Sequence, residues 1–588
     1  MILVLGGTTE GRKTIETLEE GGGTFFYSTK TGEQDVTLHH GQRIDGAMDR
    51  EAMLRFCSEH DIRLIIDAAH PFARVLHETV ASVAATLQIP AIRYERIYPP
   101  RDADITWIDD YQDIPRDIHT LLATTGVQSI ARLKPLEAEG MKIYYRILPR
   151  ESSIALARKQ GATDEQLCYY EDGNSIDIDA EAILLKESGL SGGFPEKVEA
   201  ARQRGMRIIT LKRPQLMTAG CQLSTVNGPY GLRRAVERLL PDFYPLHSGL
   251  TTGTCATAAA IAATLQLLKQ ECPKEVDVLL PNGETIPVPV GYGDGYAYCI
   301  KDSGDDPDVT KGIEVRVSVQ PSDTFEILGG EGVGTFTLPG FDFPPGEPAI
   351  NKGPREMIRQ NIERLTTPLH TGRGRGWVFT ISVPGGEEIA RRTFNPRLGI
   401  EGGISIIGVS GIIKPFSEEA FVDSIRKCME VAKASGTERV VINSGAKSER
   451  FVRSLYPDLP RQAFVEYGNY IGETLRMANE LGFRKVTLGV MLGKAVKLAE
   501  GQLDTHSRKG TMNLAFIQQM LDEINSKFKI TNYKLTLARE LWERLSKQEA
   551  DAFARVVIRH CLQHCQPLLP DGELTILLIG DDGTIHSL

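Results

Sequence analysis

Residues 2–12 read ILVLGGTTEGR, an apolar run followed by a glycine-rich turn and the start of a predicted helix. This order of strand, turn and helix is typical of the first unit of a parallel sheet covered by helices. Backbone N–H groups and the helix dipole can hold a pyrophosphate at such a turn. The candidate contacts are Gly6, Gly7, Thr8 and Gly11. Their spacing is looser than the GxGxxG fingerprint, so a plain tight turn is the alternative.

The same alternation of apolar runs and helical stretches continues to about residue 245, and it predicts a doubly wound parallel sheet for residues 1–245. The pattern changes near PDFYP (residues 241–245) and again near Asn395 and Pro396. Residues 246–395 open with an alanine-rich helix and continue with strand-like runs, which predicts an α+β part. In residues 396–588 the alternation returns, which predicts a second, Rossmann-like α/β part with a C-terminal tail.

Size and composition limit the function classes. A chain of 588 residues is long enough for several domains, and its net charge of −10 argues against a nucleic-acid partner. The nine cysteines follow no framework spacing, so we expect reduced thiols. The residues after Met1 have no features of a signal peptide, and no stretch reaches about 18 uninterrupted apolar residues. We therefore expect a cytoplasmic protein without a membrane anchor. The sequence leaves the oligomeric state open.

Two strand ends in the first part carry polar candidates. The second strand ends in YSTKTG, where Ser28 and Lys30 replace the acidic residue of a usual NAD site, so NADPH is favoured over NADH. The run IIDAAHPFA places His70 at the carboxyl end of a buried strand, where open α/β sheets bind ligands. His70 could donate a proton or hold a carboxylate; a structural histidine is the alternative.

The motifs GGTTEGR, IDAAHPFA, LLATTG and KESGLSGGFPEKVEAA resemble the precorrin-6A reductase family over nearly all of residues 1–240. The family usually reads DATHP, and Ala69 replaces that threonine here. The resemblance implies NAD(P)H-dependent hydride delivery to a double bond of a macrocycle, with protonation at the neighbouring carbon. It also implies His70 as a catalytic candidate and Lys186 as a substrate contact.

Two loops in the second part carry candidate binding and catalytic residues. SGLTTGTCATAAA places Thr251, Thr252 and Thr254 before an alanine-rich helix, where hydroxyl groups and free N–H groups can bind an anion. IKDSGDDPDVTKG crowds acidic residues into one loop, and Asp305 or Asp306 could serve as a general base there. Binding of a hard cation such as Mg²⁺ and simple capping of the turn by aspartates are the alternatives.

In the last part, the segments IIGVSG, VINSGAKS, EYGN and MLGK are expected as strand ends that line up at one edge of the sheet. This edge is the predicted site of S-adenosylmethionine. The predicted cofactor contacts there are Gly408, Ser410, Gly411, Asn443 and Gly445.

The motifs TTGTCATAAA, LPNG, KDSGDDPDVTKG, GGEGVG, EPAINKGPREMI, NPRLGIEGGISIIGVSGI and GKAVKLAEGQLDTHS resemble the cobalt-precorrin-5B C1-methyltransferase family from about His247 to about Asn513. Asn513 stands where an aspartate is expected. The resemblance implies methyl transfer from S-adenosylmethionine to ring carbon C1 of a tetrapyrrole, with Asp305, Asp306 or His506 removing a proton. The first part would then reduce the product of the second.

Two other interpretations stay open. A non-catalytic carrier of tetrapyrroles or nucleotides would use the same glycine-rich edges for binding alone. A conventional dehydrogenase fused to an unrelated binding module is the other, and it differs in that its C-terminal part would not consume S-adenosylmethionine. The run HCLQHC (residues 560–565) places like residues four apart on a predicted helix, but two ligands on a face do not complete a tetrahedral site, so we predict no metal.

Overall fold

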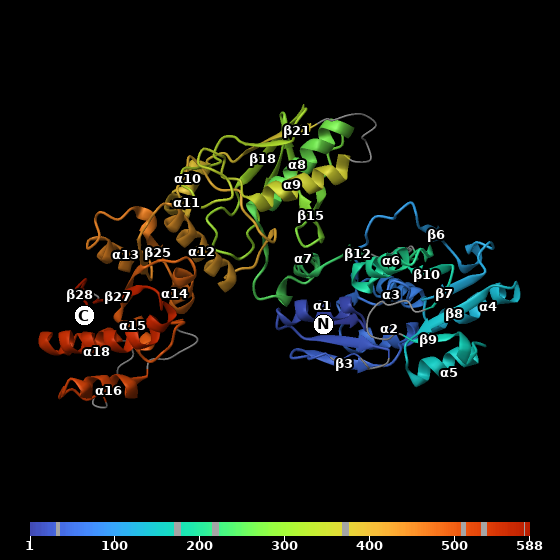
Figure 1. Cartoon of the computed structure of the whole chain (residues 1–588), viewed down its shortest axis with the longest axis horizontal. Coiled ribbons are helices and arrows are strands. Elements are labelled where there is room, and N and C mark those ends of the chain that lie inside the picture. The colour runs from blue at the N-terminus through green and yellow to red at the C-terminus, as the bar shows by residue number, and fades with distance from the viewer. Residues whose placement is uncertain are drawn as a thin grey trace. The chain divides into compact units, whose positions relative to one another are not determined.

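The computed structural model is a mixed α/β structure with parallel sheets (Figure 1). It describes residues 1–30, 34, 36–169, 178–214, 223–366, 376–506, 513–530, 538–580 and 582–588. The chain divides into two compact units: Met1–Ser248 with Leu279–Pro287 form unit 1, and Gly249–Val278 with Val288–Leu588 form unit 2. Each unit is described by itself.

Unit 1 begins with a six-stranded sheet in which every pairing is parallel. Its strands, in spatial order, are β12 (Leu223–Val226), β5 (Ala91–Tyr94), β4 (Leu64–Asp67), β1 (Ile2–Leu5), β2 (Phe25–Thr29) and β3 (Gly41–Asp45). Its helices are α1 (Thr9–Glu19), α2 (Arg50–Glu59), α3 (Arg74–Leu87) and α7 (Pro229–Leu239). The apolar run that opens the chain forms the fully buried β1, near the middle of this sheet.

A second six-stranded parallel sheet completes unit 1, where the sequence analysis expected a single sheet. Its strands, in spatial order, are β6 (Thr106–Ile108), β11 (Arg207–Leu211), β10 (Ala182–Lys186), β7 (Thr120–Ala123), β8 (Lys142–Ile147) and β9 (Leu167–Tyr169). Its helices are α4 (Ile130–Ala138), α5 (Glu151–Lys159) and α6 (Phe194–Gln203). Alternation of strands and helices is the same within one sheet or two, so the pattern could not show where the first sheet ends.

In the first part of unit 2, one helix packs on a mostly antiparallel sheet and a second helix packs on the first. Helix α8 (Thr252–Lys269) packs against α9 (Lys352–Thr366) and against two of the strands, β17 (Tyr296–Ile300) and β18 (Glu314–Ser322). The sheet contains, in order, β16 (Gly291–Gly293), β17 (Tyr296–Ile300), β18 (Glu314–Ser322), β21 (Gly376–Ser382) and β19 (Glu326–Gly329). Two pairs of short strands also belong to this part: β13 (Gly249–Leu250) with β23 (Ile412–Ile413), and β20 (Thr335–Phe336) with β22 (Ile400–Glu401). A third pair, β14 (Glu275–Leu279) with β15 (Thr285–Pro289), has its tip, Leu279–Pro287, in unit 1. The short helices α10 (Gly386–Ala390) and α11 (Asn395–Leu398) follow.

The last part of unit 2 is a five-stranded sheet with one antiparallel edge strand. Its strands, in order, are β25 (Phe464–Glu466), β24 (Arg439–Asn443), β26 (Lys485–Met491), β27 (Glu573–Ile579) and β28 (Ile585–His586). Its helices are α12 (Glu418–Ala434), α13 (Ala446–Arg453), α14 (Ile471–Glu480), α15 (Leu492–Ala499), α16 (Leu514–Glu523), α17 (Ala538–Trp542) and α18 (Lys547–Cys565). No helix in the described ranges is long and apolar enough to cross a membrane.

The expected strand ISIIGVSG (residues 404–411) is not a strand of this last sheet. Ile404 and Ile406 are buried and form only isolated bridges, to Val333 and to Ile350. The alternation of buried and exposed residues is that of a strand, but no neighbour pairs with it continuously. The segment therefore lies with the first part of unit 2, and the prediction that it aligns with the ends of β24, β25 and β26 is wrong.

Candidate active sites

The glycine-rich turn after β1 is shaped by a tyrosine beneath it. A Cβ atom on Gly6 would lie 2.2 Å from the ring of Tyr27, and one on Gly11 would lie 2.7 Å from its hydroxyl oxygen. The Gly7 N–H group donates to the Tyr27 hydroxyl at 2.9 Å. The Thr8 hydroxyl caps α1 by accepting from the Gly11 N–H group at 3.0 Å. Packing against Tyr27 thus explains two of the glycines without a ligand.

Gly7 is different from its neighbours. Its φ angle of 89° lies in the left-handed region, and an added Cβ would meet nothing within 4 Å. Glycine is required there by conformation, and the space above it is open. This is the position in the turn where a ligand can approach the backbone closely.

Cations gather near this turn. Lys30 is exposed at the end of β2, whereas Ser28 is buried and its carbonyl oxygen accepts from the Gly6 N–H group at 2.9 Å. Burial raises the pKa of the Tyr27 hydroxyl, and the nearby charges of Arg43 and Arg12 oppose that rise. Ser28 and Lys30 were expected here from the sequence; the two arginines were not, because they lie outside the expected strand end.

The loop after β4 that carries His70 is fixed by a buried network. His77 Nδ1 lies 2.6 Å from Asp67 Oδ2, and its Nε2 lies 3.1 Å from the His70 carbonyl oxygen. Arg93 Nη1 donates to Asp67 Oδ1 at 2.9 Å and to the Ala69 carbonyl oxygen at 2.9 Å. The side chains of Asp67, His77 and Arg93 are almost fully buried, so the loop is held by hydrogen bonds that are shielded from water.

The His70 ring is held in its neutral form. Burial, followed by the charges of Arg96 and Lys186, lowers its pKa to about 4. The Phe72 N–H group donates to His70 Nδ1 at 3.2 Å, which places the hydrogen of the neutral ring on Nε2. His70 therefore offers an N–H donor near neutral pH rather than an imidazolium.

Lys186 reaches the same place from the second sheet. It ends β10, and its Nζ lies 5.1 Å from the centre of the Phe72 ring. Burial lowers its pKa. The structure thus brings together the two residues that the sequence analysis took from separate motifs.

Further charged groups, which the sequence analysis did not single out, surround this pair. Arg96 Nε donates to Glu10 Oε2 at 3.0 Å, and its Nη1 donates to the Ser188 carbonyl oxygen at 2.8 Å. Burial alone would raise the pKa of Glu10, but hydrogen bonds from Ser191 and Arg96 hold it below its usual value. Lys197 donates to the Gly192 carbonyl oxygen at 3.0 Å. Glu10 and Lys197 lie within the quoted motifs; nothing in the sequence distinguished Arg96.

In unit 2, Thr251, the N-cap of α8, and Thr252 and Thr254 in its first turn form a threonine loop that binds a segment of its own chain. The Thr254 hydroxyl donates to the Gly411 carbonyl oxygen at 2.6 Å, and the Ile407 N–H group donates to the Thr252 hydroxyl at 2.9 Å. The Thr251 hydroxyl accepts from the Thr254 N–H group at 3.2 Å. The hydroxyl groups of Thr252 and Thr254 thus hold residues 405–411, whereas that of Thr251 caps the helix. The contact of these three residues with an anionic substrate stays a prediction.

Gly408 and Gly411 lie against this loop. A Cβ on Gly408 would lie 2.3 Å from Thr251 Oγ1, and Gly411 accepts the Thr254 bond. The Ser410 hydroxyl donates to the Ile412 carbonyl oxygen at 3.0 Å. The structure therefore groups these three residues with the threonine loop, and not with Asn443 and Gly445.

The acidic loop is largely satisfied from within. Lys301 is buried and its Nζ lies 2.5 Å from Asp308 Oδ2. Burial alone would raise the pKa of Asp308, but Lys301 and Thr310 hold it below its usual value. Asp306 accepts from the Phe416 N–H group at 3.2 Å, and Asp305 is exposed. Capping of the turn, which the sequence analysis left as an alternative, accounts for most of the loop.

The carboxyl ends of β24, β25 and β26 carry a second cluster of polar groups. Asn443 is fully buried, and its Oδ1 accepts from the Gly445 N–H group at 3.1 Å. A Cβ on Gly445 would lie 3.2 Å from a carboxylate oxygen of Glu466. Burial raises the pKa of Glu466, with Arg397 opposing the rise. Lys494 donates to the Gly468 carbonyl oxygen.

His506 lies at the same edge. Its N–H group donates to Asp504 Oδ1 at 3.1 Å, and its neighbour Thr505 donates from its N–H group to the Asn469 carbonyl oxygen at 3.1 Å. Asn513, where an aspartate was expected, caps α16 by accepting from two N–H groups. Neutral Asn513 therefore has a capping role that needs no charge.

No group of three or more metal-ligating side chains occurs in the part of the chain that the structure describes. In HCLQHC, Cys561 and Cys565 are buried in the core, whereas His560 Nε2 lies 2.8 Å from Glu523. The two cysteines therefore face the core, whereas His560 faces a glutamate of another helix.

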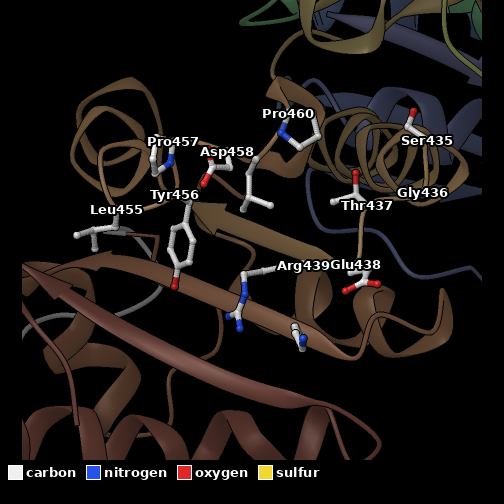
Figure 2. A pocket seen from close by; sticks show the side chains of 12 residues that line it. Ser435, Gly436, Thr437, Glu438, Arg439, Leu455, Tyr456, Pro457, Asp458 and Pro460 are labelled. Carbon is white, nitrogen blue, oxygen red and sulfur yellow. The ribbon is translucent and has the colours of Figure 1, made fainter.

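A cavity of about 470 Å³ opens at the amino ends of β24 and β26 (Figure 2). Its lining includes Thr437, Arg439, Tyr456 and Lys485. It lies at the opposite end of these strands from Asn443, and none of the predicted site residues lines it.

Comparison with known proteins decides between these interpretations. A cobalt-precorrin-5B C(1)-methyltransferase of Prosthecochloris aestuarii is 42% identical over 354 residues, which cover 58% of this chain and 95% of that protein. The chain belongs to the cobalt-precorrin-5B C(1)-methyltransferase family. The family model described as CbiD matches residues 242–415. A second member of this family, from Thermus thermophilus, is 44% identical over 280 residues, covering 47% of this chain and 74% of the relative.

Ahead of this methyltransferase part, residues 1–229 match the family model described as precorrin-6x reductase CbiJ/CobK. A solved structure described as CobK precorrin-6A reductase is 19% identical and covers 41% of this chain and 96% of its own, with a TM-score of 0.33. The chain is thus a fusion of a reductase and a C1-methyltransferase of cobalamin biosynthesis, which confirms both resemblances found in the sequence.

Proposed function

We propose that this chain catalyses two consecutive steps. Unit 2 methylates ring carbon C1 of cobalt-precorrin-5B with S-adenosylmethionine, and unit 1 reduces the resulting cobalt-precorrin-6A to cobalt-precorrin-6B with NAD(P)H. The observation that carries the proposal is the presence of both families in one chain, with 95% of a methyltransferase relative covered. The order of the two parts along the chain is the reverse of the order of the reactions.

The turn after β1 fits a dinucleotide. Open space above Gly7 allows close approach of a pyrophosphate, Gly6 and Gly11 shape the turn, and Thr8 caps the following helix. Lys30 with Arg12 and Arg43 would provide positive charge for a 2′-phosphate, which favours NADPH over NADH. Bound there, the nicotinamide supplies the hydride.

His70 and Lys186 would hold the macrocycle beside that turn. His70 offers its Nε2–H group as a hydrogen-bond donor, and Lys186 offers a positive charge to a substrate carboxylate. Arg96 and Lys197 extend the positive field. A cluster of several cations suits a substrate with several carboxylates.

At the carboxyl edge of the last sheet, Asn443, Gly445 and Glu466 fit S-adenosylmethionine, which supplies the methyl group. A half-buried carboxylate beside a glycine turn is suited to accept hydrogen bonds from ribose hydroxyls. His506 at this edge and Asp305 and Asp306 in the acidic loop remain the proposed bases for proton removal. The predicted contacts of Gly408, Ser410 and Gly411 with the cofactor, and of Thr251, Thr252 and Thr254 with substrate, remain predictions, as does the three-part division at residues 245 and 395.

The decisive experiment incubates the full chain anaerobically with cobalt-precorrin-5B and S-adenosylmethionine, with and without NADPH or NADH, and follows the mass of the macrocycle. We expect a gain of one methyl group, and then of two hydrogens only when a nicotinamide is present. Binding of the tetrapyrrole without any mass change would overturn the proposal in favour of the carrier interpretation.

A matched pair of variants sharpens the reductase site. Lys186→Met should lower kcat/KM of the reduction about a hundredfold, since a buried charge contact to the substrate is lost. Lys159→Met, which changes an exposed lysine of α5, should leave it unchanged. Methylation should be unaffected in both; equal reduction by the two variants would exclude Lys186 from the site.

A further inference from the structure

Unit 1 contains a short segment, Leu279–Pro287, that lies outside the reductase sequence. The segment is the tip of the β14–β15 hairpin and falls inside residues 242–415, which match the methyltransferase family model. It also contains the LPNG motif. Part of the methyltransferase sequence is therefore folded into the reductase unit.

The centre of this contact is the carboxylate of Glu284, which is 1% exposed. Its Oε2 accepts from the N–H groups of Tyr230 at 2.9 Å and Gly231 at 3.0 Å. Pro229, the first residue of α7, has no N–H group, so these are the first two backbone donors of the helix. Such donors have no partner inside the helix, and a carboxylate is well suited to bind them.

Neighbouring residues fix the segment further. The Asn282 side chain donates to Glu284 Oε1 at 2.5 Å, and the Thr285 N–H group donates to Asn227 Oδ1 at 2.8 Å. Burial raises the pKa of Glu284, while the two helix amides and Asn282 oppose the rise. The carboxylate is thus fully enclosed and bonded on both oxygens.

Gly228 makes room for this carboxylate. It occupies the N-cap position of α7, where serine, threonine, asparagine or aspartate would usually cap the helix, and no side chain of its own caps it. Its φ of −170° is open to any residue. A Cβ there would lie 1.9 Å from Cγ and Cδ of Glu284. The glycine is required by space, because the cap comes from a distant part of the chain.

The helix held in this way belongs to the core of the reductase. Leu232, Ala235 and Val236 of α7 lie in one buried cluster with Val4 of β1 and with Tyr27, which shapes the glycine-rich turn. A displaced α7 would therefore disturb the strand and the tyrosine on which that turn is built.

We propose that Leu279–Pro287 is an intramolecular docking element: the reductase unit presents the N-terminus of α7 as a binding surface for an acidic hairpin tip, and the methyltransferase sequence provides that tip. The fold of the reductase is incomplete without it.

The test uses the full chain and two alanine substitutions three residues apart, Gly228→Ala and Gly231→Ala. The Gly228 variant forces Glu284 out, whereas a Cβ on Gly231 meets Val226 at an ordinary 3.5 Å. Hydrogen exchange of the Tyr230 and Gly231-position amides, read by NMR or mass spectrometry, should be about tenfold faster in Gly228→Ala, as expected for a lost helix cap. It should be unchanged in Gly231→Ala.

Glu284→Ala covers the case in which Gly228→Ala does not fold, because it removes the carboxylate without adding bulk. Glu275→Ala, an exposed glutamate of the same hairpin, is its control. Faster exchange at Tyr230 in Glu284→Ala alone would support the docking element. Unchanged exchange in that variant would overturn it. Neither measurement needs substrate, so the outcome is independent of the proposed activities.

Discussion

The glycine-rich turn at the start of α1 and the threonine loop at the start of α8 share one pattern: small or hydroxyl residues begin a helix that follows a strand. At the first, Tyr27 supports the turn from below and leaves the space above Gly7 open. At the second, the hydroxyls of Thr252 and Thr254 are bonded to residues 405–411, and residues 252–264 are all buried. The first helix start thus has open space beside Gly7, whereas the second is bonded to a segment of the same chain. The residues that lie opposite a helix start determine whether that space stays open.

The largest loss of stability is expected when the packing of the glycine-rich turn on Tyr27 is disrupted. Gly6→Ala should destabilise unit 1 by about 3 kcal/mol, because the new methyl group overlaps the fully buried Tyr27 ring. Denaturant unfolding followed by a probe in unit 1 measures this. A loss well below about 1 kcal/mol would mean that Tyr27 does not support the turn.

A smaller loss of stability is expected when the hydrogen bond between Thr254 and Gly411 is removed. Thr254→Val should destabilise unit 2 by about 2 kcal/mol, since the Gly411 carbonyl oxygen loses a donor in a buried site. Thr254→Ser, which keeps the hydroxyl, is the control for the change of side chain. If both variants unfold alike but the valine variant alone loses substrate affinity, Thr254 is a ligand contact and the comparison fails.

The third prediction concerns the pH dependence of unit 1, which contains His70 beside the first turn. The pKa of His70 is lowered to about 4 in the folded chain from 6.5, so the unfolded chain binds the extra proton first as the pH falls. The contribution of His70 to the free energy of unfolding is therefore fully present above about pH 6.5, and it declines by about 1.4 kcal/mol per pH unit toward pH 4. Unit 1 unfolding measured at several pH values should show this slope, and His70→Asn should remove it. An equal slope in the variant would assign the titration to another group.

The smallest loss of stability is expected at Gly7, where one variant can distinguish a requirement of backbone conformation from a contact with a ligand. Gly7→Ala should cost about 1–2 kcal/mol, from the left-handed φ alone, since no atom opposes the new methyl group. The same methyl should weaken NADPH binding, measured by fluorescence titration, by more than the stability loss explains. Unaltered binding would show that the open space is not used.

The sequence predicted where the strands lie better than it predicted which strands pair with one another. Apolar runs such as those of β1, β4 and β10 were found because burial on both faces needs them. The same reasoning made residues 404–411 a strand of the last sheet, because alternation of apolar residues says which side is buried but not which segment pairs with it. The split of unit 1 into two sheets was missed for a related reason.

The candidate site was predictable where one motif carried it and not where distant residues meet. His70 and Lys186 came from motifs, but the contact of Arg96 with Glu10 joins residues 86 positions apart. The pairing of Lys301 with Asp308 needed the shape of the acidic loop, so its crowded carboxylates looked freer than they are.

The cap that Glu284 provides has a consequence for anyone who recombines such enzymes. A chimera that joins a foreign methyltransferase to residues 1–245 would keep every residue of the reductase sequence and still replace the hairpin that completes its fold. Crossovers in this chain are therefore best chosen so that residues 227–231 and 279–287 come from the same parent, although about fifty positions separate them.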